Sequence, residues 1–114
     1  MNLTAEQKEI LKQCRETYGD VAQILVSIEE LNELACVLAK YPRYDDHVKA
    51  ITELKDKALD EVADVVIVLD HIVNILGLTD DEIAARTDKK VHRVERWLDT
   101  NDKFSQTLVD RVVE

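Results

Sequence analysis

Two pairs of acidic residues are the positions most able to do chemistry in this 114-residue chain. The first pair is Glu30 and Glu33, and the second is Glu61 and Asp64. Both pairs stand in apolar sequence, where a carboxylate loses hydration unless a cation or a hydrogen-bond donor compensates it. Four such carboxylates brought together are suitable ligands for a hard divalent cation, which we expect to be Mg²⁺, with Mn²⁺ as an alternative.

The elements that would position these acids are two amphipathic helices. Apolar residues follow helical spacing over 20–38, with Asp20 as the expected N-cap. A longer apolar pattern begins at residue 48 and runs to Leu76, where Gly77 is expected to end the helix. Residues three apart on a helix lie about 60° apart, so each acidic pair shares one face. Two antiparallel helices would then bring all four acids around one point.

Each acidic pair also has a simpler explanation. It could be a solvated face near a helix end, or it could form ion pairs with Lys57 and Arg43. With Ile28 taken as the core direction of its helix, Glu30 and Glu33 point away from the main apolar stripe. Their neighbours one turn away are nevertheless apolar. One pair alone favours the simpler explanation, whereas two pairs on the two most apolar helices favour a metal site.

Two further helices are indicated by capping signals. Thr4 with Gln7 predicts a helix over 5–17, and Thr79 with Glu82 predicts another that runs through Leu98. The sequence therefore predicts an all-α fold of four to five helices in an antiparallel bundle. We expect one domain over residues 1–114, with its core in 20–98. The tail 101–114 is expected to pack on this body or on a partner subunit.

Composition excludes several classes of function. The chain has 24 acids against 15 Lys plus Arg, and its net charge of −9 disfavours binding to nucleic acid or to an anionic membrane. Cys14 and Cys36 lack the spacing of a zinc site. The N-terminus has no signal pattern, and no apolar run approaches the ~20 residues that span a bilayer. We therefore expect a soluble, cytoplasmic protein.

The valine-rich helix also predicts assembly. It carries more apolar side chains between Val62 and Leu76 than three short neighbouring helices would cover in a chain of this size. We therefore expect a homodimer or a homotetramer.

The two acidic pairs together resemble a known signature. Glu30-x-x-Glu33, 27 intervening residues, and Glu61-x-x-Asp64 on a valine-rich helix are similar to the motifs of the MazG-like all-α nucleoside triphosphate pyrophosphohydrolases, a superfamily that includes the dimeric dUTPases. The resemblance implies that the four acids bind Mg²⁺ and that one acid of the first pair orients the attacking water. It also implies cleavage of the α–β phosphate bond of a nucleoside triphosphate, which gives a monophosphate and pyrophosphate.

Three basic residues and one histidine complete the expected site. Lys90, Arg93 and Arg96 are similar to a basic run in that superfamily, and their spacing of three places them near one helix face. Such cations would bind the phosphates and offset transition-state charge. His71 follows Asp64 by two helical turns and is a candidate to contact the base or the sugar, although a buried structural histidine explains it as well.

Two other functions fit parts of the sequence. Residues 79–100 read in part as a helix-turn-helix with its turn at 87–89, which would make the protein a DNA-binding regulator, although the acidic charge opposes this. Alternatively, the chain is a helical oligomerisation module that retains the acids without activity.

Overall fold

The chain is all-helical in a computed structural model that describes residues 2–43 and 48–100, with side chains from residue 51 onward in the second range. The helices are α1 (Ala5–Tyr18), α2 (Asp20–Leu38), the short 3₁₀ helix η1 (Tyr41–Arg43), α3 (Val48–Leu76) and α4 (Asp80–Asp99), and the described residues contain no strand. The all-α expectation is thereby confirmed. The tail 101–114, with its expected packing, lies outside the described residues.

The chain divides into two units, Met1–Gly77 and Leu78–Glu114. The first unit contains α1, α2 and α3, and the second contains α4. The single domain expected from the sequence stays a prediction, and each unit is described by itself.

Helix α1 begins and ends as its sequence indicates. The Thr4 hydroxyl accepts a hydrogen bond from the Gln7 backbone N–H at 3.1 Å, and the Thr4 backbone N–H donates to the Gln7 side chain at 2.8 Å. This capping box satisfies two N–H groups that a helix start would leave free. Helix α1 ends before Gly19, whose φ of 90° lies in a region that suits glycine. The chain therefore turns directly from α1 into α2.

The expected role of Asp20 as the N-cap of α2 is wrong. Gly19 occupies the N-cap position without a side-chain hydrogen bond, and Asp20 is the first residue inside the helix. The physical reason is the short connection, because one glycine makes the whole turn between α1 and α2. From inside the first turn, the Asp20 carboxylate still interacts favourably with the helix dipole.

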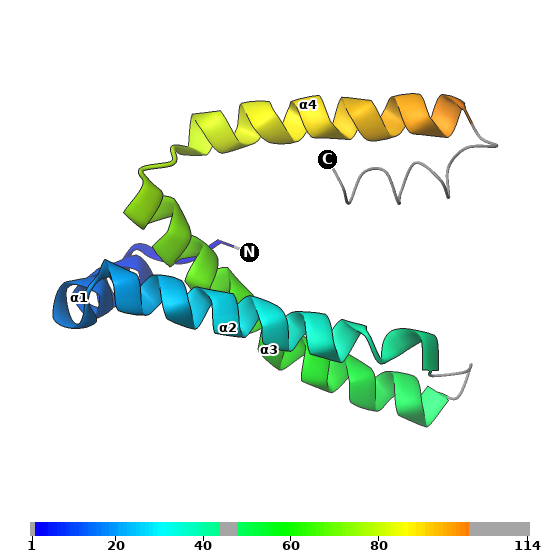
Figure 1. Cartoon of the computed structure of the whole chain (residues 1–114), viewed down its shortest axis with the longest axis horizontal. Helices are drawn as coiled ribbons and strands as arrows, with labels where there is room; N and C mark the ends of the chain where they lie inside the picture. The colour runs from blue at the N-terminus through cyan, green and yellow to red at the C-terminus, as the bar shows by residue number, and fades with distance from the viewer. Residues whose placement is uncertain (1, 44–47, 101–114) are drawn as a thin grey trace. The chain divides into compact units, whose positions relative to one another are not determined.

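Helices α2 and α3 pack against each other as an antiparallel pair, which Figure 1 shows as two ribbons running in opposite directions. The inner seam is the set of residues through which the two helices face each other, identified by their burial. On α2 it contains Gln23, Ser27, Glu30, Leu34 and Val37, and on α3 it contains Leu54, Ala58, Glu61, Val65, Val68 and Ile72. The spacing of three and four is that of a coiled-coil seam.

The inner seam corrects the expected orientation of α2. Ile28 was expected to mark the core side, but it is 52% exposed, whereas Gln23 and Ser27 are buried. The more polar stripe of α2 therefore faces α3, and the more apolar stripe lies on the outside. Only Val37, Leu54 and Val68 are buried hydrophobic residues within the described part of the chain.

In the second unit, α4 has the capping box predicted for it. The Thr79 hydroxyl accepts from the Glu82 backbone N–H at 3.1 Å, and the Thr79 backbone N–H donates to the Glu82 carboxylate at 3.1 Å. Helix α4 then continues without a break to Asp99. Residues 87–89 therefore lie inside a helix, and the turn required by the helix-turn-helix alternative is not formed.

No single described helix has the length and hydropathy needed to cross a membrane.

Candidate metal centre

The four acids singled out from the sequence come together between α2 and α3. One carboxylate oxygen from each of Glu30, Glu33, Glu61 and Asp64 lies within 4.8 Å of the others. Glu30 and Glu33 come from consecutive turns of α2, and Glu61 and Asp64 come from consecutive turns of α3. We call these four residues the acid cluster. Their convergence follows from antiparallel packing of two i, i+3 pairs.

Two oxygens of the acid cluster are buried without a partner. Oε2 of Glu30 and Oε2 of Glu61 are both shielded from solvent and accept no hydrogen bond from any described group. Glu33 is exposed, and the other three acids are partly buried. Buried polar atoms in native proteins are nearly always satisfied, so these oxygens are places where an ion, a water or a ligand would fit. Here two such oxygens lie in the same cluster.

The electrostatics of the cluster favour a positively charged ligand. Burial, together with the negative charges of Glu33 and Asp64, raises the pKa of Glu30 from 4.5 to about 7. Burial and the same two neighbouring charges also raise the pKa of Glu61. Like charges at such distances oppose each other's ionisation. A cation at this position would remove the repulsion.

The chain supplies no such cation from the described residues of this unit. The expected alternative of ion pairs with Lys57 and Arg43 is not formed, since neither side chain pairs with an acid of the cluster. The set of oxygen donors therefore fits a hard divalent cation such as Mg²⁺ or Mn²⁺, which prefers carboxylate and water ligands.

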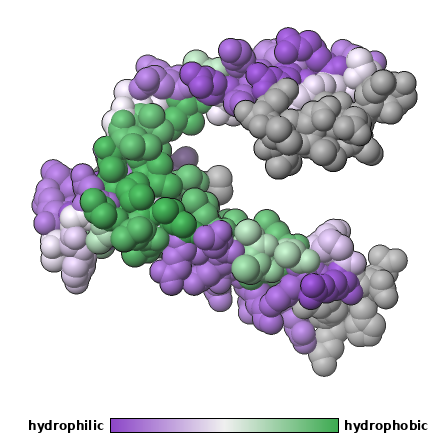
Figure 2. Space-filling model, in the orientation of Figure 1, coloured by the Kyte–Doolittle hydropathy of each residue, from purple (hydrophilic) through white to green (hydrophobic). Residues whose placement is uncertain are grey.

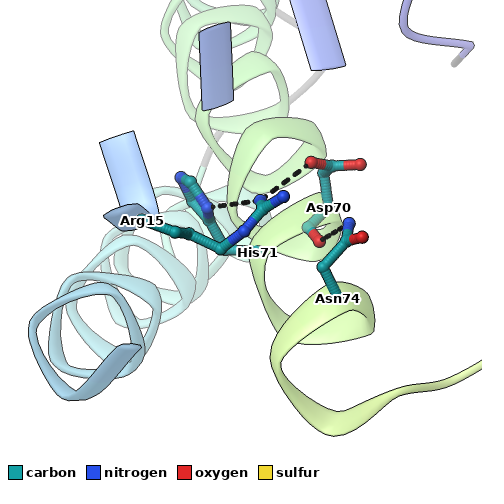
Figure 3. Close-up of polar contacts among 4 residues, drawn as sticks. All are labelled: Arg15, Asp70, His71 and Asn74. Carbon is teal, nitrogen blue, oxygen red and sulfur yellow. Dashed lines mark hydrogen bonds and ion pairs between the residues drawn. The ribbon is translucent and has the colours of Figure 1, made fainter. Parts of the chain in front are cut away.

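A second polar cluster lies on α3, two turns beyond the acids, and Figure 3 shows it joining α1 to α3. The Arg15 guanidinium of α1 donates from Nη1 to Asp70 Oδ2 at 3.2 Å and to His71 Nδ1 at 3.0 Å. The side chains of Arg15 and Asp70 are 11% and 10% exposed, and His71 is 2% exposed. We call these three residues the Arg15 cluster.

The Arg15 cluster fixes the protonation of His71. Arginine has no acceptor, so Nδ1 of His71 must accept and the ring proton must sit on Nε2. Burial lowers the pKa of His71, and the Arg15 charge lowers it further, while Asp70 opposes the change. His71 is therefore a buried neutral histidine with a structural partner. Its contact with substrate stays a prediction.

Sequence reasoning identified neither Arg15 nor Asp70 as a site residue. Arg15 had no distinguishing signal, because it occurs in a helix with several other charged residues. Asp70 did carry a distinguishing signal. It interrupts an apolar helix in the same way as Glu61, and the argument that demanded a partner for Glu61 applied equally to Asp70.

The expected phosphate-binding residues Lys90, Arg93 and Arg96 all lie on α4, in the second unit. Their i, i+3, i+6 spacing in a continuous helix places them near one face, as expected. A pocket of about 290 Å³ lies near the start of the same helix and is lined by Leu78, Glu82, Ile83, Arg86 and Thr87. Its carboxylate belongs to the capping box, so this pocket adds no catalytic group.

Comparison with known proteins gave no match to a family model, to a curated protein sequence or to a solved structure. The resemblance to the MazG-like superfamily therefore stays a prediction from the motif residues of the sequence.

Proposed function

We propose that the protein is a Mg²⁺-dependent nucleoside triphosphate pyrophosphohydrolase that cleaves the α–β phosphate bond. The observation that supports this most strongly is the acid cluster, in which Glu30 and Glu61 each hold a buried, unpartnered oxygen. A structural cluster of acids would be expected to have paired its oxygens with donors from the chain. A cluster that binds a cation is expected to leave its carboxylate oxygens without donors from the chain.

Each acid has a distinct part in this proposal. Glu61 and Asp64 would hold the ion from α3, and Glu30 and Glu33 would hold it from α2. When bound, Mg²⁺ supplies positive charge to the phosphate oxygens and lowers the pKa of a bound water. The exposed Glu33 carboxylate can accept a hydrogen bond from the attacking water, which orients the water and takes its proton.

The α4 cations and His71 are assigned to the substrate in the same proposal. Lys90, Arg93 and Arg96 of the second unit stay candidates for phosphate binding from their sequence, because positive charge offsets the charge that develops during phosphoryl transfer. The neutral ring of His71 carries its proton on Nε2, so that atom could only donate a hydrogen bond to the sugar or base.

A nucleotide panel with product identification tests the activity. The full chain is incubated with Mg²⁺ and with each common ribo- and deoxyribonucleoside triphosphate, and the products are separated and identified. We expect at least one substrate to give the monophosphate and pyrophosphate in equal amounts. Diphosphate and phosphate as products would instead show cleavage of the β–γ bond.

Two controls make this experiment decisive. Chelation of the metal should stop product formation, and re-addition of Mg²⁺ should restore it. If no nucleotide of the panel reacts with either Mg²⁺ or Mn²⁺, the proposal fails and the non-catalytic helical module becomes the better account.

A further inference from the structure

Helix α1 is attached to the rest of the first unit by few contacts. Its partly buried residues are Leu11, Cys14 and Arg15, and no residue of α1 is fully buried within the described part of the chain. Figure 2 shows mainly hydrophilic and intermediate surface over α1, beside the hydrophobic surface over α2 and α3. The apolar area that holds α1 in place is therefore small, and so is the stabilisation it supplies.

The connection to α2 allows α1 to move as one element. Gly19 alone joins Tyr18 of α1 to Asp20 of α2, with a φ of 90°. A Cβ built at Gly19 would meet no described atom within 4 Å, so this residue has open space around it. No described side chain caps the start of α2 with a hydrogen bond. Rotation about the backbone bonds of one glycine can therefore change the direction of α1 and leave α2 intact.

Among the described residues, the hydrogen bonds that join α1 to α3 come from Arg15. Its Nη1 lies 3.2 Å from Asp70 Oδ2 and 3.0 Å from His71 Nδ1, and Figure 3 shows the side chain reaching from α1 toward both. The second bond requires a neutral His71, because an imidazolium carries a proton on each nitrogen and cannot accept. We propose that protonation of His71 releases α1 from α3, which makes the Arg15 cluster a pH-sensitive contact.

Protonation of His71 replaces an attraction by a repulsion. The new proton on Nδ1 faces the guanidinium across 3.0 Å, and the two positive charges share the single negative charge of Asp70. Asp70 and His71 are neighbours on α3 and stay together, whereas Arg15 can move into water with α1. Asp70 then compensates the imidazolium in the released state. The acid cluster takes no part in this step, so the proposal does not depend on the proposed activity.

The groups that face His71 from α2 and α3 supply little further charge. The pairing of α2 with α3 in the acid cluster places Gln23 level with His71, and Gln23 is buried and uncharged. Asp20 is the charge of α2 nearest to this level, and it is exposed. On α3, the uncharged Asn74 side chain donates to the backbone oxygen of Asp70 at 2.7 Å. Asp70 is therefore the principal acid acting on His71.

The charges on α1 set the direction of the pH effect. Lys12 and Glu16 are exposed and pair with each other, so Arg15 is the cation that acts on His71. Burial lowers the pKa of His71 and Arg15 lowers it further, while Asp70 opposes both. Release of α1 removes Arg15 and exposes the ring, so the pKa returns toward its ordinary value of 6.5 or above. Protons then favour the released state, and the released fraction grows as pH falls below about 6.5.

Hydrogen exchange of the full chain, measured by mass spectrometry, tests this proposal. A released α1 of 14 residues is only marginally helical in water, so its amides lose protection. Exchange is compared at pH 7.5 and pH 5.5 after correction for intrinsic rates. We expect the protection of α1 to fall several-fold, up to about tenfold, because release takes up one proton. The protection of residues 61–76 of α3 should not fall.

His71→Gln is the variant that removes the titrating group. The Gln side-chain oxygen can accept from Arg15 at any pH, so the fall in α1 protection between the two pH values should disappear. His92→Gln is the matched control, because His92 lies exposed on α4 beside Asp88 and Glu95. This control should keep the full pH response of α1.

Arg15→Met covers the case in which His71→Gln does not fold. Without the guanidinium, α1 should be weakly protected at both pH values. Equal protection of α1 at the two pH values in wild type would overturn the proposal. A pH response retained by His71→Gln would also overturn it, and so would a joint loss of protection by α1 and α3.

Discussion

Two polar clusters that both include residues of α3 differ in whether their charges are satisfied. In the Arg15 cluster, one guanidinium lies within hydrogen-bonding distance of both Asp70 and His71. In the acid cluster, two turns away on α3, four carboxylates converge and two of their oxygens have no partner. Burial of charge is unfavourable in both clusters. Only the Arg15 cluster contains an opposite charge that compensates for it.

The difference separates structure from function. A satisfied cluster joins helices and needs nothing from outside the chain, so we interpret the Arg15 cluster as the polar anchor between α1 and α3. An unsatisfied cluster destabilises the chain until something binds, and natural sequences retain such features mainly at functional sites. The following variants test this division, in order of decreasing expected effect.

Loss of a ligand from the acid cluster should have the largest effect. We expect Glu61→Gln to lower the rate of pyrophosphate release by more than about 100-fold, because loss of even an outer-shell partner of a metal ligand costs roughly 10- to 100-fold. Without metal, the variant should unfold at no lower temperature than wild type, since Gln resembles the neutral carboxyl that burial favours.

Glu29→Gln is the matched control for this change, because Glu29 is exposed and lies outside the cluster. Steady-state turnover should be unchanged by it. Equal activity of Glu61→Gln and wild type would remove Glu61 from the site.

Loss of the Arg15 guanidinium should lower the stability of the fold, whereas it should not affect metal binding by the acid cluster. Arg15→Met leaves Asp70 buried and unpaired, which is expected to cost about 3 kcal/mol of unfolding free energy. Urea unfolding followed by circular dichroism measures this. Lys12→Met is the control, because the Lys12–Glu16 pair is long at 4.0 Å and largely exposed, and should contribute less than about 1 kcal/mol.

The double variant Arg15→Met with Asp70→Leu sharpens the test, since it removes both charges together. It should recover part of the lost stability. If Arg15→Met is no more harmful than Lys12→Met, the Arg15 cluster is not the anchor inferred here.

The acid cluster should also make stability depend on pH in a direction unusual for carboxylates. The folded pKa of Glu30 is about 7, against an ordinary value of 4.5. Between these two values the unfolded chain releases a proton that the folded chain keeps, so the contribution of Glu30 to stability falls as pH rises. The unfolding temperature of Glu30→Gln should therefore exceed that of wild type by a margin that grows from pH 4.5 to pH 7 in chelator.

Saturating Mg²⁺ should remove this margin or reverse it, because a bound ion favours the ionised carboxylate. A margin that does not depend on pH, or that Mg²⁺ leaves unchanged, would contradict the assignment of Glu30.

The smallest expected effect is on the titration of His71. Its pKa should lie below the ordinary value of 6.5, because the ring is buried next to Arg15. In Arg15→Met the positive neighbour is lost and Asp70 remains, so the pKa should rise. Imidazole NMR signals followed from pH 5 to pH 8 would show both changes. A wild-type pKa above 6.5 would mean that the ring is not held as a neutral acceptor.

Local patterns predicted much of this fold, for identifiable reasons. Capping boxes at Thr4 and Thr79 are short-range signals, and both are confirmed. The convergence of the four acids was also predicted, from the i, i+3 spacing of two pairs on two antiparallel helices. The face of α2 that meets α3 was not predicted correctly, because the more apolar stripe around Ile28 was assumed to face α3. Hydrophobicity indicates which stripes are unfavourable to expose, but it does not tell which stripe faces a given neighbouring helix.

The Arg15 cluster was not predictable in full, because it depends on how α1 crosses α3, and no spacing within one helix records that crossing. The sequence offered only half of the signal, an acid and a histidine side by side in an apolar helix.

The most direct test of the central claim is Mn²⁺ binding at pH 7.5, measured by calorimetry on wild type, Glu30→Gln and Glu29→Gln. If the acid cluster is a metal site, wild type and Glu29→Gln should bind Mn²⁺ alike, and Glu30→Gln should bind it at least about tenfold more weakly. Identical binding by all three proteins, or no binding by wild type, would contradict the claim that the carboxylates of Glu30 and Glu61 bind a divalent cation.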